Sequence, residues 1–328
     1  MLKYLRSNQQ VFTAFIFLYC FISVFVIFFF HPESVYSAIP FKTPFLGDFT
    51  GRPFTYDHKD IGFSLVSFFT FLIAGFYLVR ININHLIIPN RSQFPALFFI
   101  SAAALALRYE MYSSVLFATF FLLLSIDRLF GAIQKQGLSY RFLDAGILIA
   151  LGSLFYFNLI FFFPFLWIAQ FTLRTPNFRE FLYTLIGLSI PFLYIFSGYY
   201  VLDLSIAQSF NDIKEWLFLK KYLDMSWTFL SGILFYACSM FIANIYALKK
   251  FATTKIHVRK LFQLWFYLFL NALMIYLVIP SAGIEILIIM AIPSSVLLSI
   301  YFTDCRDSIA NRVFLFLLIT VPVVLNLL

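Results

Sequence analysis

The chain has 328 residues, of which 62% are hydrophobic and only 12% are charged, and its mean hydropathy is +0.92. Soluble domains carry about a quarter charged residues, so this composition excludes a soluble globular protein and predicts a membrane protein. A net charge of +8 would suggest a nucleic-acid partner in a soluble protein. Here the basic residues lie mostly in short loops between apolar runs, where they indicate topology, and we expect no nucleic-acid partner.

The first apolar run covers residues 11–30 and follows two basic residues. No small-residue cleavage site follows this run, so we interpret it as a retained first helix with its N-terminus in the cytoplasm. The three cysteines make no spaced pair, so neither a disulfide nor a thiolate metal site is expected.

A polar segment, 31–60, follows the first helix and is the longest polar stretch of the chain. A carboxylate held at the membrane–water boundary can act as a general base or bind a metal ion that bridges a phosphate. The alternative interpretation is a solvated loop whose four prolines limit its flexibility. The acid–base candidates in this first outer loop are Glu33, Asp48, Asp57, His58 and Asp60.

The apolar stretch 94–126 is interrupted by Arg108, Tyr109 and Glu110. In a single helix these charges would lie near the middle of the bilayer at a cost of several kcal/mol, so we expect two short helices with the triplet at their turn. If the turn lies in a depression of the outer surface, the planar fork of Arg108 suits a phosphate group. The alternative is a local pair of Arg108 with Glu110.

The stretch 142–174 is apolar almost throughout, yet a single helix over its length would be about 50 Å long against a hydrocarbon core of roughly 30 Å. It is either one kinked span or two short helices that turn around Asn158. With both long stretches divided, eleven spans place sixteen of the 23 Lys and Arg residues on the cytoplasmic side, whereas nine spans place thirteen there. Eleven spans fit better and put Asn158 outside. Asp144 is expected to cap the helix that begins this stretch.

Segment 202–227 interleaves apolar and charged residues at helical spacing, which predicts an amphipathic helix on the outer membrane surface. We therefore expect an all-α polytopic protein with one integral membrane domain, 1–328, about eleven spans, several short helices and an outer C-terminus. The spans that follow directly from uninterrupted apolar runs are 11–30, 61–79, 181–201, 228–248, 264–279, 286–302 and 313–328.

The four histidines fall on both sides of the expected membrane, with His31 and His58 outside and His85 and His257 inside. Four ligands divided across a core of roughly 30 Å cannot meet at one metal ion. We therefore expect no histidine metal site and no cofactor. A divalent metal on the outer carboxylates is the remaining alternative.

The run FLDAGILIALGSLFYFNLIFFFPFLWIAQFTLRTPNFREFLYTLIGLSIPFLY resembles an uncharacterised family of bacterial multi-pass membrane proteins over about residues 90–200. The stretch NRSQFPALFFISAAALALRYEMYSSVLFATFFLLLSIDRLFGA is similar to the third and fourth helices of the GT-C glycosyltransferases. The order of a first helix, a long outer loop, short helices and a later amphipathic outer segment resembles the same fold. The resemblance implies an enzyme that takes a sugar from a polyprenyl-phosphate carrier at the outer face of the bacterial inner membrane.

By this resemblance the catalytic base is an acid of the first outer loop, Glu33 or Asp48, although the usual acidic pair has no clean counterpart here. Arg108 would contact the carrier phosphate, and Glu110 and His58 would complete the substrate site. Besides membrane lipids and this carrier, a membrane protein partner is a further expected contact. The alternative functions are a non-catalytic subunit or scaffold of an envelope or secretion complex and a transporter of lipid-linked material.

Overall fold

The computed structural model describes residues 9–30, 61–88, 92–110, 114–133, 140–173, 177–203, 205–218, 227–251 and 254–327. Every regular element within these ranges is helical, which confirms the expected all-α class. In chain order the elements are α2 (Gln9–Phe30), α4 (Ile61–His85), α5 (Phe94–Glu110), α6 (Val115–Phe130), α7 (Tyr140–Phe155), the 3₁₀ helix η1 (Phe157–Phe162), α8 (Phe163–Leu173), α9 (Phe178–Val201), α10 (Ile206–Phe218), α11 (Trp227–Phe251), α12 (Ile256–Val278), α13 (Ile286–Asp304) and α14 (Ile309–Leu327).

Six helices in the described part of the chain are long and apolar enough to cross a membrane. They contain apolar segments of 18 to 24 residues, which at about 1.5 Å per residue match a hydrocarbon core of roughly 30 Å. Shorter apolar helices lie beside them, over 94–106 and 157–173. These lengths agree with a multi-pass helical membrane protein. The six helices are α2, α9, α11, α12, α13 and α14.

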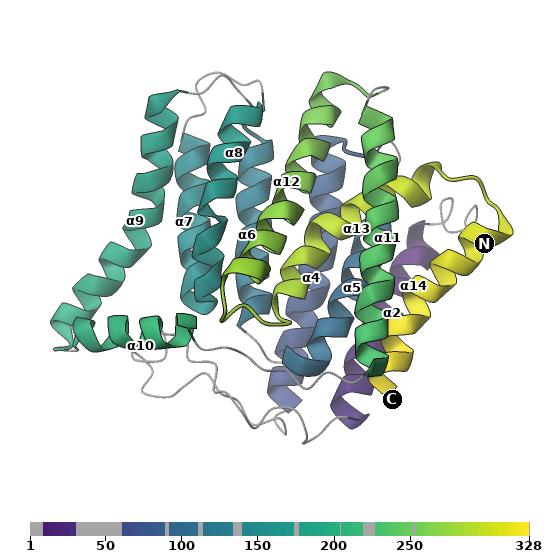
Figure 1. Cartoon of the computed structure of the whole chain (residues 1–328), viewed down its shortest axis with the longest axis horizontal. Coiled ribbons are helices and arrows are strands. Elements are labelled where there is room, and N and C mark those ends of the chain that lie inside the picture. The colour runs from purple at the N-terminus through teal and green to yellow at the C-terminus, as the bar shows by residue number, and fades with distance from the viewer. Residues whose placement is uncertain are drawn as a thin grey trace.

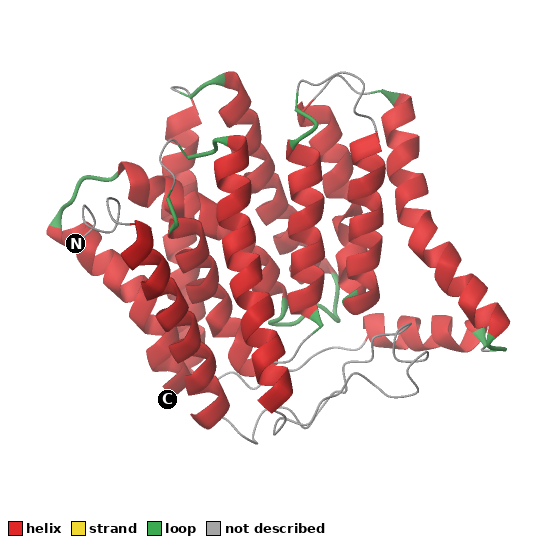
Figure 2. Ribbon diagram, turned by 180° about the vertical axis from the view of Figure 1, so that it is seen from behind, coloured by secondary structure: helices red, strands yellow, loops and turns green. Residues whose placement is uncertain are grey.

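The helices form one bundle, and α10 lies across one end of it (Figures 1 and 2). We call this end the α10 end; the η1 turn, the 279–285 turn and the last residues of α2 and α14 also lie there (Figure 1). The centre of the bundle is α13, which packs against α5, α11 and α12. In α13, 78% of the apolar segment is buried, against 17% in α9, so α13 is apolar on all sides because protein surrounds it.

Both long apolar stretches are divided into helix pairs. The first breaks after Glu110, where α5 ends, and α6 begins at Val115. The second breaks at Tyr156, whose backbone is extended (φ −136°, ψ 101°), and the chain then reverses through η1. Pro164 follows in the first turn of α8, where its missing N–H costs no helical hydrogen bond. The charges of the first stretch and the length of the second therefore predicted real breaks.

Several helices extend beyond the expected apolar runs. α4 continues past 79 to His85, and α12 begins at Ile256 instead of 264. The expected bounds were too short because hydropathy reports which residues suit hydrocarbon, whereas helical hydrogen bonding continues into the polar boundary of a membrane. The cap expected of Asp144 is wrong for a similar reason. α7 begins at Tyr140, so the first turn contains no acidic residue.

α7 and α9 pack closely at two glycines. A Cβ added to Gly146 would lie 2.7 Å from the carbonyl oxygen of Thr184, and one added to Gly187 would overlap the carbonyl oxygen of Leu143. Small residues let helix backbones approach in this way in membrane proteins. Beyond this contact α9 contains Pro191 and leans away from α7 toward α10 (Figure 1). A proline inside a helix is a common cause of such a bend.

α14 also contains a proline, Pro322, which has no N–H to donate to the carbonyl of Leu318 four residues earlier. The hydroxyl of Tyr236 on α11 donates to this carbonyl instead. Tyr19 on α2 donates to the next carbonyl, that of Ile319, at 3.0 Å. Two tyrosines from distant helices therefore satisfy the backbone next to the proline, where no water is available in hydrocarbon.

Candidate functional site at the α10 end

Three of the five site residues predicted from the sequence, Glu33, Asp48 and His58, lie outside the described residues. The other two, Arg108 and Glu110, lie in the last turn of α5, of which the backbone alone is described. The last turn of α2, the first turn of α4 and the last turn of α5 all lie at the α10 end (Figure 1). The helices that flank the predicted site residues are thus brought to one end of the bundle.

A buried polar cluster joins two turns at this end. Asn158 of η1 donates to the Tyr156 hydroxyl at 3.1 Å and accepts a hydrogen bond from the Ser281 hydroxyl at 3.2 Å. Asn158 and Tyr156 are fully buried and Ser281 is 1% exposed. Buried polar groups are normally hydrogen-bonded, and here the bonds fix η1 to the 279–285 turn.

Glu285 is a buried acid that the sequence reasoning missed. It is 1% exposed and occupies the position immediately before α13. A carboxylate there interacts favourably with the positive end of the helix dipole. The signal in the sequence was a single acid inside a long apolar run, and ionisable residues in such runs are functional candidates by default.

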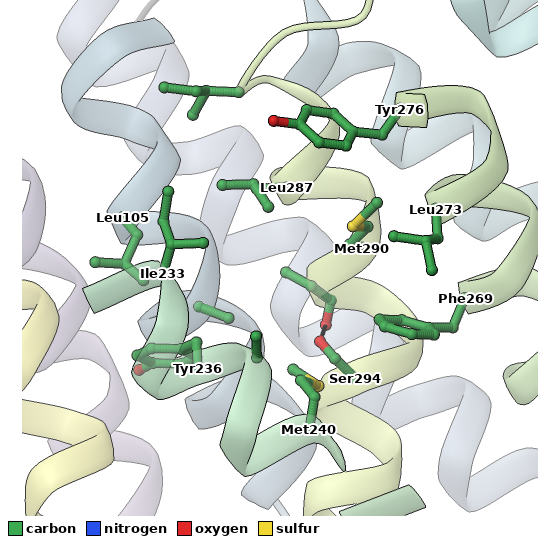
Figure 3. Close-up of a pocket in the computed structure, with 14 residues that line it drawn as sticks. Leu105, Ile233, Tyr236, Met240, Phe269, Leu273, Tyr276, Leu287, Met290 and Ser294 are labelled. Carbon is green, nitrogen blue, oxygen red and sulfur yellow. Dashed lines mark hydrogen bonds between the residues drawn. The ribbon is translucent and has the colours of Figure 1, made fainter. Parts of the chain in front are cut away.

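An apolar cavity of about 230 Å³ lies beside the same turn and is lined by residues of α5, α11, α12 and α13 (Figure 3). Tyr276 lies at one end of the cavity and Met240 lies at the other (Figure 3). Ile284 of the 279–285 turn also lines the cavity. The two hydroxyls deeper in its wall are occupied within the protein. Tyr236 donates to Leu318, and Ser294 donates to the carbonyl of Ala291 at 2.8 Å.

A second apolar hollow, the α8–α9 groove, lies where α9 leans away from the bundle. It has a volume of about 640 Å³ and is lined by η1 and α8 on one side and by α9 on the other. Its walls include Phe161, Pro164, Leu188 and Phe192. α10 packs against α9 near this groove, because the buried residue Ile213 of α10 lies in a cluster with Tyr199 of α9. Lys214 and Glu215 of α10 are exposed, so α10 has an apolar face and a charged face.

The opposite end of the bundle carries a second polar cluster. Asp127 of α6 accepts hydrogen bonds from His85 Nε2 at 2.8 Å and from the Tyr77 hydroxyl at 2.9 Å, both of α4. The ring of His85 also packs edge-on against Phe130, with 5.5 Å between ring centroids. A carboxylate shared by two donors from one helix ties α4 to α6, so we assign this cluster a structural role.

Replacing Asp127 by alanine should lower the Tm of the purified protein, because His85 and Tyr77 then lose their common acceptor. The expected cost is on the order of 2 kcal/mol. Asp144→Ala is the matched control: Asp144 lies 3.9 Å from Arg128 in a half-exposed pair, which should contribute less than about 1 kcal/mol. Equal Tm values for the two variants would contradict the structural role of Asp127.

The α10 end therefore combines a buried acid, a buried polar cluster and apolar hollows, an arrangement suited to an amphiphilic molecule. Within the described ranges, no three His, Cys, Asp or Glu side chains lie close enough together to hold a metal ion. No family model, curated protein or solved structure matches this chain.

Proposed function

We propose that the protein is a GT-C-like membrane protein of the bacterial cell envelope that transfers a sugar from a polyprenyl-phosphate carrier at the α10 end. One observation carries the proposal. The helices that flank the predicted acids and Arg108 end on the side of the bundle where α10 and the α8–α9 groove lie (Figure 1). Such a transfer needs an acidic residue, a residue that binds the phosphate and an apolar groove for the carrier chain, all at one end of the bundle.

The chemistry assigns one part of the carrier to each feature. The polyprenyl chain is apolar and lies in the α8–α9 groove, while Arg108 binds the phosphate through paired N–H groups. Glu33 or Asp48 accepts the proton of the acceptor hydroxyl. The acceptor oxygen then forms a bond with the anomeric carbon, and the bond to the carrier phosphate breaks. Glu110 and His58 hold the sugar.

The proposal includes eleven spans, a cytoplasmic N-terminus and an α10 end that faces outward. It is supported by the excess of Lys and Arg on the opposite side, sixteen of 23. Asn158 is buried, so a cysteine introduced there would be inaccessible to a labelling reagent. The neighbouring residue Phe157 is half-buried and is the better position for labelling. We expect Phe157→Cys to react with a membrane-impermeant maleimide added outside intact cells. Reaction only after permeabilisation would invert the topology.

Substitution of the predicted site residues tests the transfer itself. Proteoliposomes that contain the purified protein and a polyprenyl-phosphate sugar should lose transfer by about 100-fold or more in Asp48→Asn or Glu33→Gln, whichever removes the base, because a positioned base contributes that much. Arg108→Gln should also lose transfer, because it removes the paired N–H groups that bind the phosphate. Asp57→Asn and Asp60→Asn, in the same segment, are the matched controls and should keep transfer.

Normal transfer by all three site variants would overturn the proposal. If the acids tolerate substitution and the protein co-purifies with another membrane protein at a fixed ratio, the chain is a non-catalytic subunit. Flipping of the carrier without sugar transfer would instead indicate a transporter.

A further inference from the structure

The apolar cavity has a closed side and an open side. Most residues of its α5 and α13 walls are buried, including Leu105, Ala291 and Ser294. On the other side, Ala237 of α11 and Tyr276 of α12 line the cavity and are exposed. The mouth of the cavity therefore lies between α11 and α12 (Figure 3).

The surface around this mouth is apolar. On α11, Leu234 and Phe241 are 64% and 68% exposed, and on α12, Met274 and Leu277 are 57% and 69% exposed. Both helices are long and apolar enough to span a membrane, and a surface of this kind is stable only in hydrocarbon. The cavity thus opens sideways toward lipid chains, away from water.

We propose that this cavity binds the end of an acyl chain of a bilayer phospholipid, which enters between α11 and α12. None of the described residues that line the cavity carries an ionic side chain, and the hydroxyls of Tyr236 and Ser294 are bonded within the protein. The described lining residues thus offer no group that selects a head group, so the most abundant chain in the surrounding bilayer occupies the cavity by mass action. The proposal is independent of the proposed function, which assigns the carrier chain to the α8–α9 groove.

The size of the cavity sets the length of chain that enters. A dry apolar cavity of about 150 Å³ holds one benzene, so 230 Å³ corresponds to about nine carbon atoms by the same ratio. Met240 and Met290 both line it, and unbranched thioether side chains adapt their shape to a neighbouring chain. An acyl chain bound only by its last part fits this volume.

Tyr276 gives the bound chain a direction. It lies at the end of the cavity next to the 279–285 turn, and its hydroxyl points away from α12 across that end of the cavity (Figure 3). Tyrosine favours the membrane–water boundary because its ring is apolar and its hydroxyl is polar. The ester groups of the lipid therefore lie at Tyr276, and the terminal methyl lies toward Met240 and Phe269.

The test uses the full-length protein in nanodiscs of phosphatidylethanolamine and phosphatidylglycerol with a trace of phosphatidylcholine that carries a diazirine near the acyl terminus. After photolysis, mass spectrometry locates the labelled residues. We expect labelling of Phe269 and Met290 in the unmodified protein. In Ala237→Phe the larger side chain narrows the mouth, and labelling should fall about tenfold, which corresponds to a loss of about 1.4 kcal/mol in the binding free energy of the chain. Cys238→Phe is the matched control, because Cys238 is exposed on the same helix but does not line the cavity.

Two results would overturn the proposal. One is labelling of Phe269 that is unchanged in Ala237→Phe and in Ile233→Phe, a second mouth variant that also serves if the first does not fold. The other is displacement of the probe by unlabelled polyprenyl phosphate but not by the same amount of unlabelled phospholipid, which would assign the cavity to a carrier chain. Because no sugar transfer is measured, neither result bears on the proposed enzyme activity.

Discussion

Replacing Gly187 by alanine is expected to lower the Tm of the detergent-solubilised protein by roughly 6–12 °C, which corresponds to about 3 kcal/mol. The new Cβ would overlap the carbonyl oxygen of Leu143 and lie 3.2 Å from the amide nitrogen of Ile147. These are backbone atoms of α7, so they cannot rotate away as a side chain would. Gly187→Leu should remove the monodisperse folded peak in size-exclusion chromatography.

Gly75→Ala is the matched control for this contact. A Cβ at Gly75, in the middle of α4, would meet Ile100 at 3.5 Å and Ala96 at 3.6 Å, which are ordinary van der Waals distances. Alanine should be tolerated there, and its better helix propensity adds up to about 1 kcal/mol. A Gly187→Ala protein as stable as Gly75→Ala would show that α7 and α9 do not pack through their glycines.

A double-mutant cycle of Tyr236 and Pro322 should show strong coupling. Tyr236→Phe removes the donor to the Leu318 carbonyl, and a buried acceptor left without a partner costs about 1–3 kcal/mol. In a Pro322→Ala background the backbone N–H of residue 322 returns and bonds the same carbonyl. Tyr236→Phe should then cost little, so the Tm difference between the tyrosine and phenylalanine proteins nearly disappears.

Tyr19→Phe provides the comparison at the neighbouring carbonyl of α14. Tyr19 bonds the Ile319 carbonyl, whose helical donor four residues later, Val323, is not a proline. Its removal should therefore cost less than removal of the Tyr236 hydroxyl. Additive effects of Tyr236→Phe and Pro322→Ala would contradict the assignment of Tyr236 to the proline-freed carbonyl.

The sequence was most informative where a physical limit was exceeded. The charges of Arg108 and Glu110 could not lie in mid-bilayer, and a helix over 142–174 was too long for hydrocarbon, so both breaks were predictable. Helix ends were less predictable, as α12 shows with its polar first turns, because polar boundary residues also form helices.

The contacts within the bundle could not be predicted in the same way. Pro322 indicates that the Leu318 carbonyl lacks its helical donor, but nothing in the sequence shows which of the 19 tyrosines replaces that donor. The cavity is the space left between four helices, so it depends on packing that no local pattern encodes. Glu285 could have been suspected as a lone acid, yet its burial depends on the turn that precedes α13.

The bond between Tyr19 and Ile319 also constrains the order of assembly during synthesis. These residues are 300 positions apart, so at 5–20 residues per second roughly 15–60 s separate their emergence from the ribosome. Throughout that interval the Tyr19 hydroxyl has to wait in the bilayer for its final acceptor. α2 is therefore synthesised long before it reaches all of its native contacts, which gives the insertion machinery a long window in which α2 is only partly docked.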